Sequence, residues 1–234
     1  MSIDEFKVQV DSLGIQYTDY QLQQLEQYYN LLVEWNQKIN LTAIIEKDQV
    51  YLKHFYDSLT LVKIIDLKDQ ESLCDVGTGA GFPGIVLKIF FPNLKITLLD
   101  SLQKRIDFLN LVIQELDLKN IETIHARAEE YARENREKYD IVTARAVSHT
   151  SIILEYGIPM VKVGKYVILM KGNVGSEIEE SKIALTKLKS QINNVIEFDL
   201  PKEAGHRTLI SCLKCEKTNP LFPRKYSDIK KKKL

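Results

Sequence analysis

The chain has 234 residues and a formal net charge of zero at pH 7, with 44% hydrophobic and 27% charged residues. This composition is typical of a globular protein with a real core, and the length suits one large domain, or one with a small extension. No apolar run approaches membrane-spanning length, and the first residues lack the basic and apolar regions of a signal peptide. We therefore expect no membrane partner, and the neutral charge argues neither for nor against nucleic acid.

The cysteines indicate the compartment. Cys74, Cys212 and Cys215 form no disulfide framework, which favours a reducing, cytoplasmic location. Cys212 and Cys215 have C-x-x-C spacing, but on a strand this spacing points the two thiols to opposite faces. No second pair of cysteines exists to complete a zinc site. We therefore interpret the cysteines as structural and predict no metal.

Residues 1–66 are predicted to form a helical extension, because no glycine or proline occurs from Ile15 to Val76. Thr18 and Gln21 have the spacing of a capping box at the start of a helix. A second helix is predicted over 49–65, and Asp57–Ser58 could break it. Residues at helical spacing, mostly apolar, follow the capping box at Leu22, Leu25, Tyr29, Leu32, Asn36 and Ile39.

Residues 67–216 alternate between predicted strands and predicted helices, and residues 217–234 form a basic tail. The alternation predicts five βα units and a closing antiparallel hairpin, because no helix fits between the last two strands. The fold class is therefore α/β, a Rossmann-like domain with a seven-stranded, mostly parallel sheet covered on both faces. Strands are predicted over 72–77, 95–100, 121–125, 139–144, 165–170, 195–200 and 207–214. Helices are predicted over 83–91, 101–116, 127–134, 150–158 and 176–190.

The segment Leu73–Gly84 is the most informative part of the chain. An apolar run ends in an acidic residue, alternating glycines follow, and an apolar amphipathic run comes next, which predicts strand, tight turn and helix. The glycines let the backbone turn sharply and approach a ligand closely. The helix start presents free N–H groups at the carboxyl end of a strand, where open α/β sheets bind nucleotides. The segment therefore predicts a cofactor that contains a nucleoside.

Two cofactors compete for this turn. Gly79–Gly84 fits the G-x-G-x-x-G pattern of dinucleotide sites, and Asp100 follows at about the expected distance. The entry Asp75-x-Gly77-x-Gly79-x-Gly81 instead resembles the first motif of Rossmann-like methyltransferases, which bind S-adenosylmethionine. In those enzymes the acidic residue helps to hold the amino-acid end of the cofactor. A structural turn without a ligand is the third interpretation.

Two further acidic residues follow predicted strands. Asp100 ends the second strand, where a carboxylate can accept hydrogen bonds from both ribose hydroxyls of an adenosine. Ser101 alone would be interpreted as a helix N-cap. Ala128 and Glu129 open the helix after the third strand, a position beside the adenine in this architecture. Glu129 could equally be a first-turn glutamate that stabilises the helix dipole, so both interpretations stay open.

Arg145 and Lys171 end the fourth and fifth strands, so we expect both at the mouth of one site, although Lys171 could also be a snorkelling surface lysine. The chain lacks the Asn/Asp-Pro-Pro-aromatic motif of amino-methylating enzymes, and it has no cysteine to attack a pyrimidine ring. A ring nitrogen with a free lone pair needs neither. Guanine N7 is such an atom, and arginine or lysine can bind the adjacent O6. Catalysis would then consist mainly of aligning N7 with the sulfonium methyl group of the cofactor.

Several separate motifs extend over nearly the whole chain in a fixed order. They are Trp35-Asn36, Asn40-Leu41-Thr42, His54–Leu59, Asp75–Gly84, Leu98–Arg105, Ala128-Glu129, Ala144-Arg145-Ala146, Lys171-Gly172, Arg207 and Phe222–Lys225. Together they resemble the 16S rRNA guanine-N7 methyltransferases, the glucose-inhibited division protein B family. The resemblance implies a class I S-adenosylmethionine-dependent methyltransferase that acts on N7 of one guanine near the decoding centre. It implies 16S rRNA, the small ribosomal subunit or its assembly intermediate as the partner. We expect a monomer, although no sequence pattern reveals the oligomeric state.

The resemblance also implies site residues. Substrate-side or catalytic roles fall on His54, Asp57, Arg145, Lys171 and Arg207. It implies cofactor contacts at Gly77, Phe82, Asp100, Ser101, Leu102, Ala128, Glu129 and Arg145. The glycine turn adds Asp75, Thr78, Gly79 and Gly81 as predicted cofactor residues. One departure is Gly205-His206-Arg207-Thr208, where many members have Glu-Arg-His or a similar triplet, so only Arg207 is carried over.

Some interpretations stay open. The tail Phe222–Lys233 is strongly basic and is either a solvated run or a phosphate-binding arm. Without the resemblance, Trp35 would be a core residue, and His54 and Asp57 could be a pair on a helix surface. Two other functions remain besides rRNA methylation. They are methyl transfer to a small molecule or protein, and nucleotide binding by a non-catalytic module or a dinucleotide oxidoreductase, which Asp75-x-Gly77 disfavours.

Overall fold

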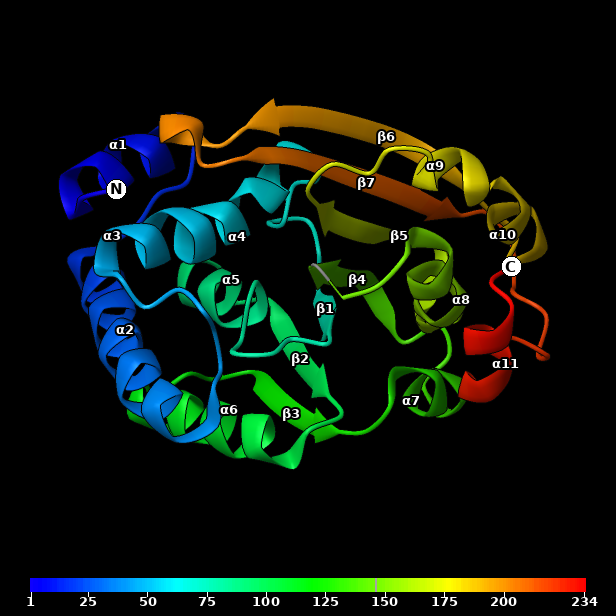
Figure 1. Cartoon of the computed structure of the whole chain (residues 1–234), viewed down its shortest axis with the longest axis horizontal. Coiled ribbons are helices and arrows are strands. Elements are labelled where there is room, and N and C mark those ends of the chain that lie inside the picture. Colours follow the sequence, from blue (N-terminus) through cyan, green and yellow to red (C-terminus); the bar gives the residue numbers. More distant parts are fainter. Residues whose placement is uncertain (146) are drawn as a thin grey trace.

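The computed structural model describes residues 1–145 and 147–234, so Ala146 of the arginine motif lies outside the described residues. One seven-stranded sheet crosses the molecule in the order β3-β2-β1-β4-β5-β7-β6 (Figure 1). The strands β1 to β5 pair in parallel, whereas β7 is antiparallel to both β5 and β6. The predicted sheet and its closing hairpin are therefore confirmed. The strands are β1 (Ser72–Val76), β2 (Lys95–Asp100), β3 (Ile121–His125), β4 (Tyr139–Arg145), β5 (Val161–Lys171), β6 (Ser190–Asp199) and β7 (His206–Lys214).

The helices between the strands match their predicted positions, with one correction. The single helix predicted over 176–190 is wrong, because two short helices meet there at Ser181 and β6 already begins at Ser190. Ser181 flanks both helices, and Lys189 has a φ of +60°, which ends the second helix before β6. The helices are α5 (Gly84–Phe90), α6 (Gln103–Glu115), α7 (Ala128–Glu134), α8 (Thr150–Met160), α9 (Glu177–Glu180) and α10 (Lys182–Lys187).

The front of the chain is helical. The capping box is confirmed: the Gln21 amide donates to the Thr18 hydroxyl at 3.3 Å, and the Thr18 amide to the Gln21 side chain at 2.8 Å. The break suggested at Asp57–Ser58 is wrong, because Asp57 keeps helical dihedral angles and a π-helical turn leads into it. The elements are α1 (Ile3–Ser12), which was not predicted as a separate helix of the extension, α2 (Asp19–Ile39), α3 (Lys47–Val50), η1 (Tyr51–Tyr56), α4 (Asp57–Leu59) and η2 (Thr60–Lys63).

The sheet has a buried layer on each face. On one face, Ile141 and Ile168 belong to a core that also contains Tyr28 of α2 and Phe55 of η1. On the other face, Val142 and its neighbours pack against α7 and α8. The front helices therefore share one core with the sheet and with α5 and α6. Figure 1 shows the front helices beside α5 and α6. Among the described residues, no helix combines the length and the apolar character that crossing a membrane requires.

Candidate active site

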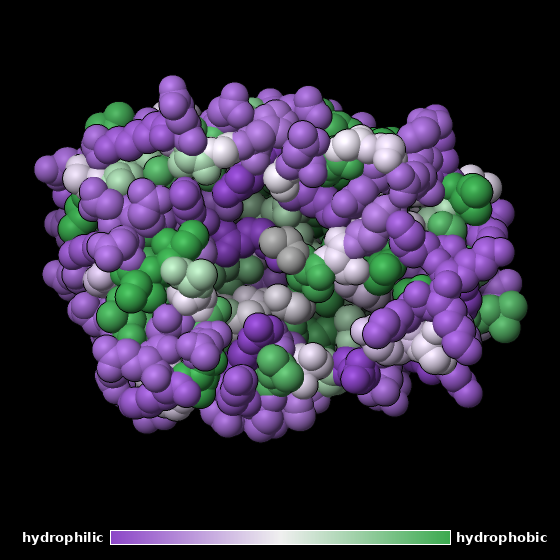
Figure 2. Space-filling view, in the orientation of Figure 1, coloured by the Kyte–Doolittle hydropathy of each residue, from purple (hydrophilic) through white to green (hydrophobic). Residues whose placement is uncertain are grey.

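A pocket of about 720 Å³ lies at the carboxyl ends of strands β1 to β5, near the centre of the face in Figure 2. Residues of the front segment 41–57 line one side, and Tyr226 of the C-terminal helix α11 (Tyr226–Lys231) lines another. Open α/β sheets bind ligands at this edge. The predicted residues that line the pocket are His54, Asp57, Gly77, Thr78, Gly79, Phe82, Asp100, Ser101, Ala128, Glu129, Arg145, Lys171 and Arg207. Asp75, Gly81 and Leu102 do not line it.

The glycine turn has an outer and an inner part. Gly79 has φ +62°, and a Cβ built on it would meet nothing closer than the Gly77 carbonyl, at 3.9 Å. Gly79 therefore faces open pocket. A Cβ on Gly81 would instead lie 2.5 Å from Ile85 and 2.8 Å from the Tyr28 hydroxyl. Gly81 thus permits close packing inside the protein, and the pocket surface of the turn is made by Gly77, Thr78, Gly79 and Ala80.

Asp75 braces the turn from below. One carboxylate oxygen, Oδ2, accepts hydrogen bonds from the Thr78 hydroxyl at 2.7 Å and from the Gly84 amide at 2.8 Å. The other oxygen has no partner among the described residues. Complete burial raises the pKa of Asp75 to about 6, although the bonds from Thr78 and Gly84 oppose this shift. Asp75 therefore fixes the start of α5 and reaches the pocket only through the turn.

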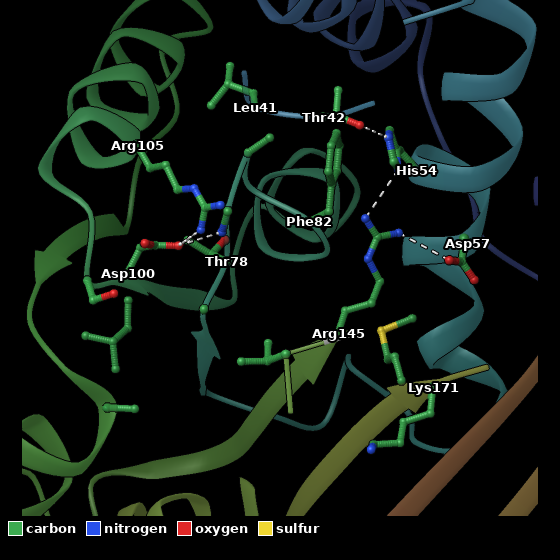
Figure 3. Close-up of a pocket in the computed structure, with 18 of the residues that line it drawn as sticks. Leu41, Thr42, His54, Asp57, Thr78, Phe82, Asp100, Arg105, Arg145 and Lys171 are labelled. Carbon is green, nitrogen blue, oxygen red and sulfur yellow. Dashed lines mark hydrogen bonds and ion pairs between the residues drawn. The ribbon is translucent and has the colours of Figure 1, made fainter. Parts of the chain in front are cut away.

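Asp100 lies on the floor of the pocket with an arginine above it. Its Oδ2 accepts from the Gly79 amide at 3.0 Å and from the Arg105 guanidinium at 3.1 Å, while Oδ1 accepts from the Leu102 amide at 3.0 Å (Figure 3). Leu102, and not Ser101, is the N-cap of α6, and the Leu102 side chain is exposed. The carboxylate therefore links the glycine turn to the first turn of α6.

Ala128 and Glu129 begin α7 at another end of the pocket. Glu129 is 6% exposed, and its Oε1 has no hydrogen-bond partner among the described residues. A buried acceptor without a partner is costly, so a ligand donor at this point would stabilise it. Arg127 and Tyr226 line the same end, with the guanidinium 4.8 Å from the centre of the tyrosine ring.

One aspartate holds two arginines at the opposite end. Asp57 Oδ1 accepts from Arg207 Nε at 2.8 Å. Asp57 Oδ2 accepts from Arg145 NH1 at 3.2 Å, and Figure 3 shows this second contact. The same Arg145 nitrogen donates to the Lys53 carbonyl at 3.1 Å. The Asp57 side chain is only 4% exposed, whereas those of Arg145 and Arg207 are 14% and 20% exposed. The cluster therefore carries one net positive charge and keeps part of each guanidinium accessible from the pocket.

His54 connects this cluster to an aromatic surface. Its ring stacks on Phe82 with centres 4.5 Å apart, and its Nε2 lies 2.9 Å from the Thr42 hydroxyl. The Arg145 guanidinium lies 5.1 Å from the centre of the Phe82 ring. Burial, together with the nearby charge of Arg145, lowers the pKa of His54 to about 3. His54 is therefore neutral at physiological pH and a weak base.

Lys171 lines the pocket but points away from the arginines. Arg145 pairs with Met170 in the register of β4 and β5, so the next residue, Lys171, projects from the opposite face of the sheet (Figure 3). Its ammonium donates to the Ser148 carbonyl at 2.8 Å and to the Glu177 carboxylate. Burial opposes ionisation of Glu177, but the bonds from Lys171 and from α8 hold the pKa of Glu177 down to about 2. Both strands therefore end at the same pocket, as expected, but the charged groups of Arg145 and Lys171 lie on opposite faces of the sheet.

The geometry agrees with what sequence comparison finds. The family model described as rRNA small subunit methyltransferase G matches residues 21–207. A Bacillus cytotoxicus protein named Ribosomal RNA small subunit methyltransferase G is 48% identical over 228 residues, which cover 96% of this chain and 95% of that protein. A Staphylococcus saprophyticus protein of the same name is 46% identical over 227 residues, with the same coverage of both chains. The chain belongs to the rRNA small subunit methyltransferase G family. This membership confirms the resemblance inferred from the motifs.

A solved structure confirms the fold of this family member. The precorrin-6y C5,15-methyltransferase of Geobacter metallireducens superposes with a TM-score of 0.52 and 15% identity, over 68% of this chain and 86% of that chain. At this identity the likeness shows the fold alone, which is the predicted Rossmann-like methyltransferase fold. Within the described residues, no group of three or more His, Cys, Asp or Glu side chains is placed to hold a metal ion.

Several residues that line the pocket had no predicted role, among them Arg105, Thr42, Arg127 and Tyr226. Arg105 belongs to the motif Leu98–Arg105. Its place in the first turn of the helix after Asp100 could have indicated its ion pair with Asp100. Thr42 belongs to the motif Asn40-Leu41-Thr42, but its contact with His54 depends on how the segment between them folds. No sequence pattern indicated that Arg127 and Tyr226 meet. They are separated by 98 residues, and they come into contact only because the tail returns to α7.

Proposed function

We propose that the protein transfers a methyl group from S-adenosylmethionine to N7 of a guanine near the decoding centre of 16S rRNA, in the cytoplasm. Its substrate would be 16S rRNA, the small ribosomal subunit or an assembly intermediate of that subunit. Family membership supports methylation of small-subunit rRNA. The observation that carries the choice of atom is the arginine pair on Asp57, which lies beside a histidine too weakly basic to take a proton.

The cofactor end of the pocket fits S-adenosylmethionine. The buried Glu129 carboxylate, with one unpartnered oxygen, offers an acceptor to an amine or hydroxyl donor. Asp100 would accept hydrogen bonds from ribose hydroxyls, and Gly79 leaves room where a side chain would block the pocket. When bound, the cofactor supplies an activated methyl group on a sulfonium sulfur. A pocket of about 720 Å³ also lies in the range typical of such ligands.

The substrate end fits a guanine edge. Arg145 and Arg207 present N–H donors, and guanine offers the O6 acceptor next to N7. A single donor on O6 leaves the N7 lone pair free to accept the methyl group. Asp57 fixes the orientation of both guanidinium groups, since each of its oxygens accepts from one of them. The Phe82 ring, packed on His54, supplies an aromatic surface beside them.

No proton has to leave the substrate in this reaction. Guanine N7 carries no hydrogen, so the protein needs no general base, and the low pKa of His54 agrees with that requirement. The residues would act by holding the acceptor atom in line with the methyl donor while excluding water. Effective molarities from such alignment account for a large part of the rate in group transfer.

The function is tested by tritiated-methyl transfer from S-adenosylmethionine to unmodified small-subunit rRNA, as naked RNA and as assembled particles. Label in 7-methylguanosine after nuclease digestion is the expected result. Label only in protein or small molecules would instead support methyl transfer to a protein or a small molecule. Binding of NAD without binding of S-adenosylhomocysteine would replace the proposal with a dinucleotide-dependent activity.

A further inference from the structure

The basic tail is fixed to the body at a buried carboxylate. The Glu155 side chain on α8 is 1% exposed. Its Oε1 accepts from the backbone amide and Nε of Arg224 at 3.0 and 2.7 Å, and its Oε2 accepts from Arg224 NH2 at 2.7 Å. Buried charges are retained only where such hydrogen bonds compensate them, so these bonds anchor the tail.

A second set of contacts ties the tail to α7 and the turn after it. Arg136 donates to the carbonyls of Phe222 and Thr218, both at 2.6 Å, and Arg133 donates to the carbonyl of Pro223 at 3.2 Å. The tail segment 218–224 is therefore held from two sides. The interpretation of the whole tail as a solvated run does not hold for this segment.

These anchors bring Tyr226 to the pocket. Tyr226 follows Arg224 by two residues and begins α11, whose Ile229 is buried at 2% exposure. Its ring lies over the Arg127 guanidinium at 4.8 Å, and both side chains line the pocket with Ala128 and Glu129. Figure 1 shows α11 beside α7, so the last part of the chain meets the end of the pocket that α7 begins.

We propose that Tyr226, stacked on Arg127, forms the outer wall of the adenosine end of the cofactor site, so that the C-terminal tail is part of that site. The inference rests on the proposed function, because it assumes an adenosine-containing cofactor. Two independent features of this end fit an adenine: an aromatic ring that offers an apolar face, and the buried, unpartnered Glu129 oxygen that accepts from an amine. Tyr226 as a whole is 47% exposed, so a bound adenosine could cover part of this residue.

The same geometry separates two roles within the tail. Tyr226 faces the pocket, whereas the side chains of Lys230, Lys231, Lys232 and Lys233 are exposed. The tail would therefore use its ring for the cofactor and leave its lysines for the solvent side. An RNA base stacked on Tyr226 is the competing occupant, and the experiment below distinguishes it.

The test measures binding of S-adenosylhomocysteine by calorimetry to the full chain and to Tyr226→Ala, Tyr226→Phe and Arg127→Ala. Tyr226→Ala and Arg127→Ala should each weaken binding by about fivefold, while Tyr226→Phe should stay within about twofold, because the ring and not the hydroxyl forms the wall. Leu221→Ala is the matched control, since Leu221 is a tail residue that is 76% exposed and does not line the pocket. Circular dichroism and thermal melting check that each variant is folded.

Methylthioadenosine, which keeps the adenosine and lacks the amino-acid end, should lose affinity by the same factor in Tyr226→Ala. If the wild-type protein binds S-adenosylhomocysteine and the folded Tyr226→Ala variant binds it equally well, the inference is overturned while the proposed function stands. Loss of RNA affinity at unchanged cofactor affinity would assign the ring to an RNA base and would also overturn it. Failure of the wild-type protein to bind S-adenosylhomocysteine would reject both the inference and the proposed function.

Discussion

Asp57 and Arg145 form an ion pair across the boundary between the helical front and the sheet, with Oδ2 of the carboxylate 3.2 Å from NH1 of the guanidinium. They lie 88 positions apart in the chain, and the other oxygen of Asp57 holds Arg207, 150 positions away. A buried carboxylate without these partners would be strongly unfavourable, so the three residues form one unit. The front therefore orients the groups at the substrate end of the pocket as well as covering the sheet.

Removing the charge of Asp57 should slow methyl transfer. Asp57→Asn keeps the shape of the side chain, but we expect the single-turnover rate on rRNA to fall by about 10- to 100-fold, because both arginines lose their orientation. Affinity for S-adenosylhomocysteine should stay within about twofold, since Asp57 lies at the other end of the pocket. Asp69→Asn is the control, because Asp69 is exposed and makes no ion pair among the described residues. Equal rates in the two variants would contradict the orienting role.

A side chain at Gly79 should remove cofactor binding and leave the fold intact. Gly79→Val places three carbons where the turn faces open pocket, at φ +62°, a conformation that costs about 1–3 kcal/mol for a residue with a side chain. We expect calorimetry on the folded variant to detect no binding of S-adenosylhomocysteine. Gly164→Val controls for backbone strain, because Gly164 has φ +80°, open space around it and no place in the pocket lining. Unchanged affinity in Gly79→Val would reject this placement of the cofactor.

Lys171 can act on the substrate directly or through Glu177. Lys171→Met should lower the transfer rate by about 10- to 100-fold if its ammonium aligns the base or a phosphate. The substitution also strips Glu177 of a partner, so Lys171→Met combined with Glu177→Gln is the informative comparison. A direct role predicts that the double variant stays as slow as the single one. Recovery of the rate in the double variant would show that the lysine only neutralises Glu177.

The exposed lysines of the tail should contribute to RNA affinity through phosphates. Changing Lys230, Lys231, Lys232 and Lys233 to serine should weaken rRNA binding and flatten its salt dependence at unchanged cofactor affinity. Substitution is cleaner than deletion of residues 222–234, which would also remove the Arg224 anchor of Glu155. An unchanged salt slope would return these lysines to the interpretation of a solvated run. The charge-matched control changes four exposed lysines that do not line the pocket, Lys68, Lys119, Lys187 and Lys202.

Local chemistry explains which parts of the site were predictable. Gly79 follows β1, and Asp100 and Arg145 end β2 and β4. The carboxyl ends of parallel strands meet at one edge of a sheet, so position in the chain indicates position in space. The pairing of Asp57 with Arg145 and Arg207 depends on how the front docks, which no local pattern encodes.

The direction of a side chain was harder to predict than the end of a strand. Lys171 comes one residue after Met170, the register partner of Arg145, and this single step turns its charge to the opposite face of the sheet. The long helix expected over 176–190 is instead divided at Ser181, and Lys189, with a φ of +60°, cannot continue it.

The most direct test of the central claim, methyl transfer to guanine N7 by alignment without a general base, is the pH dependence of the single-turnover rate on small-subunit RNA with identification of the product. The pKa of His54 is lowered to about 3, so its ring is already neutral throughout the assay range, and no proton has to leave guanine N7. We expect 7-methylguanosine as the product and a rate that is nearly flat from about pH 7 to pH 9, above the pKa of about 6 of the buried Asp75 carboxyl. A bell-shaped profile centred near neutrality, or a methyl group on an exocyclic amine, would contradict it.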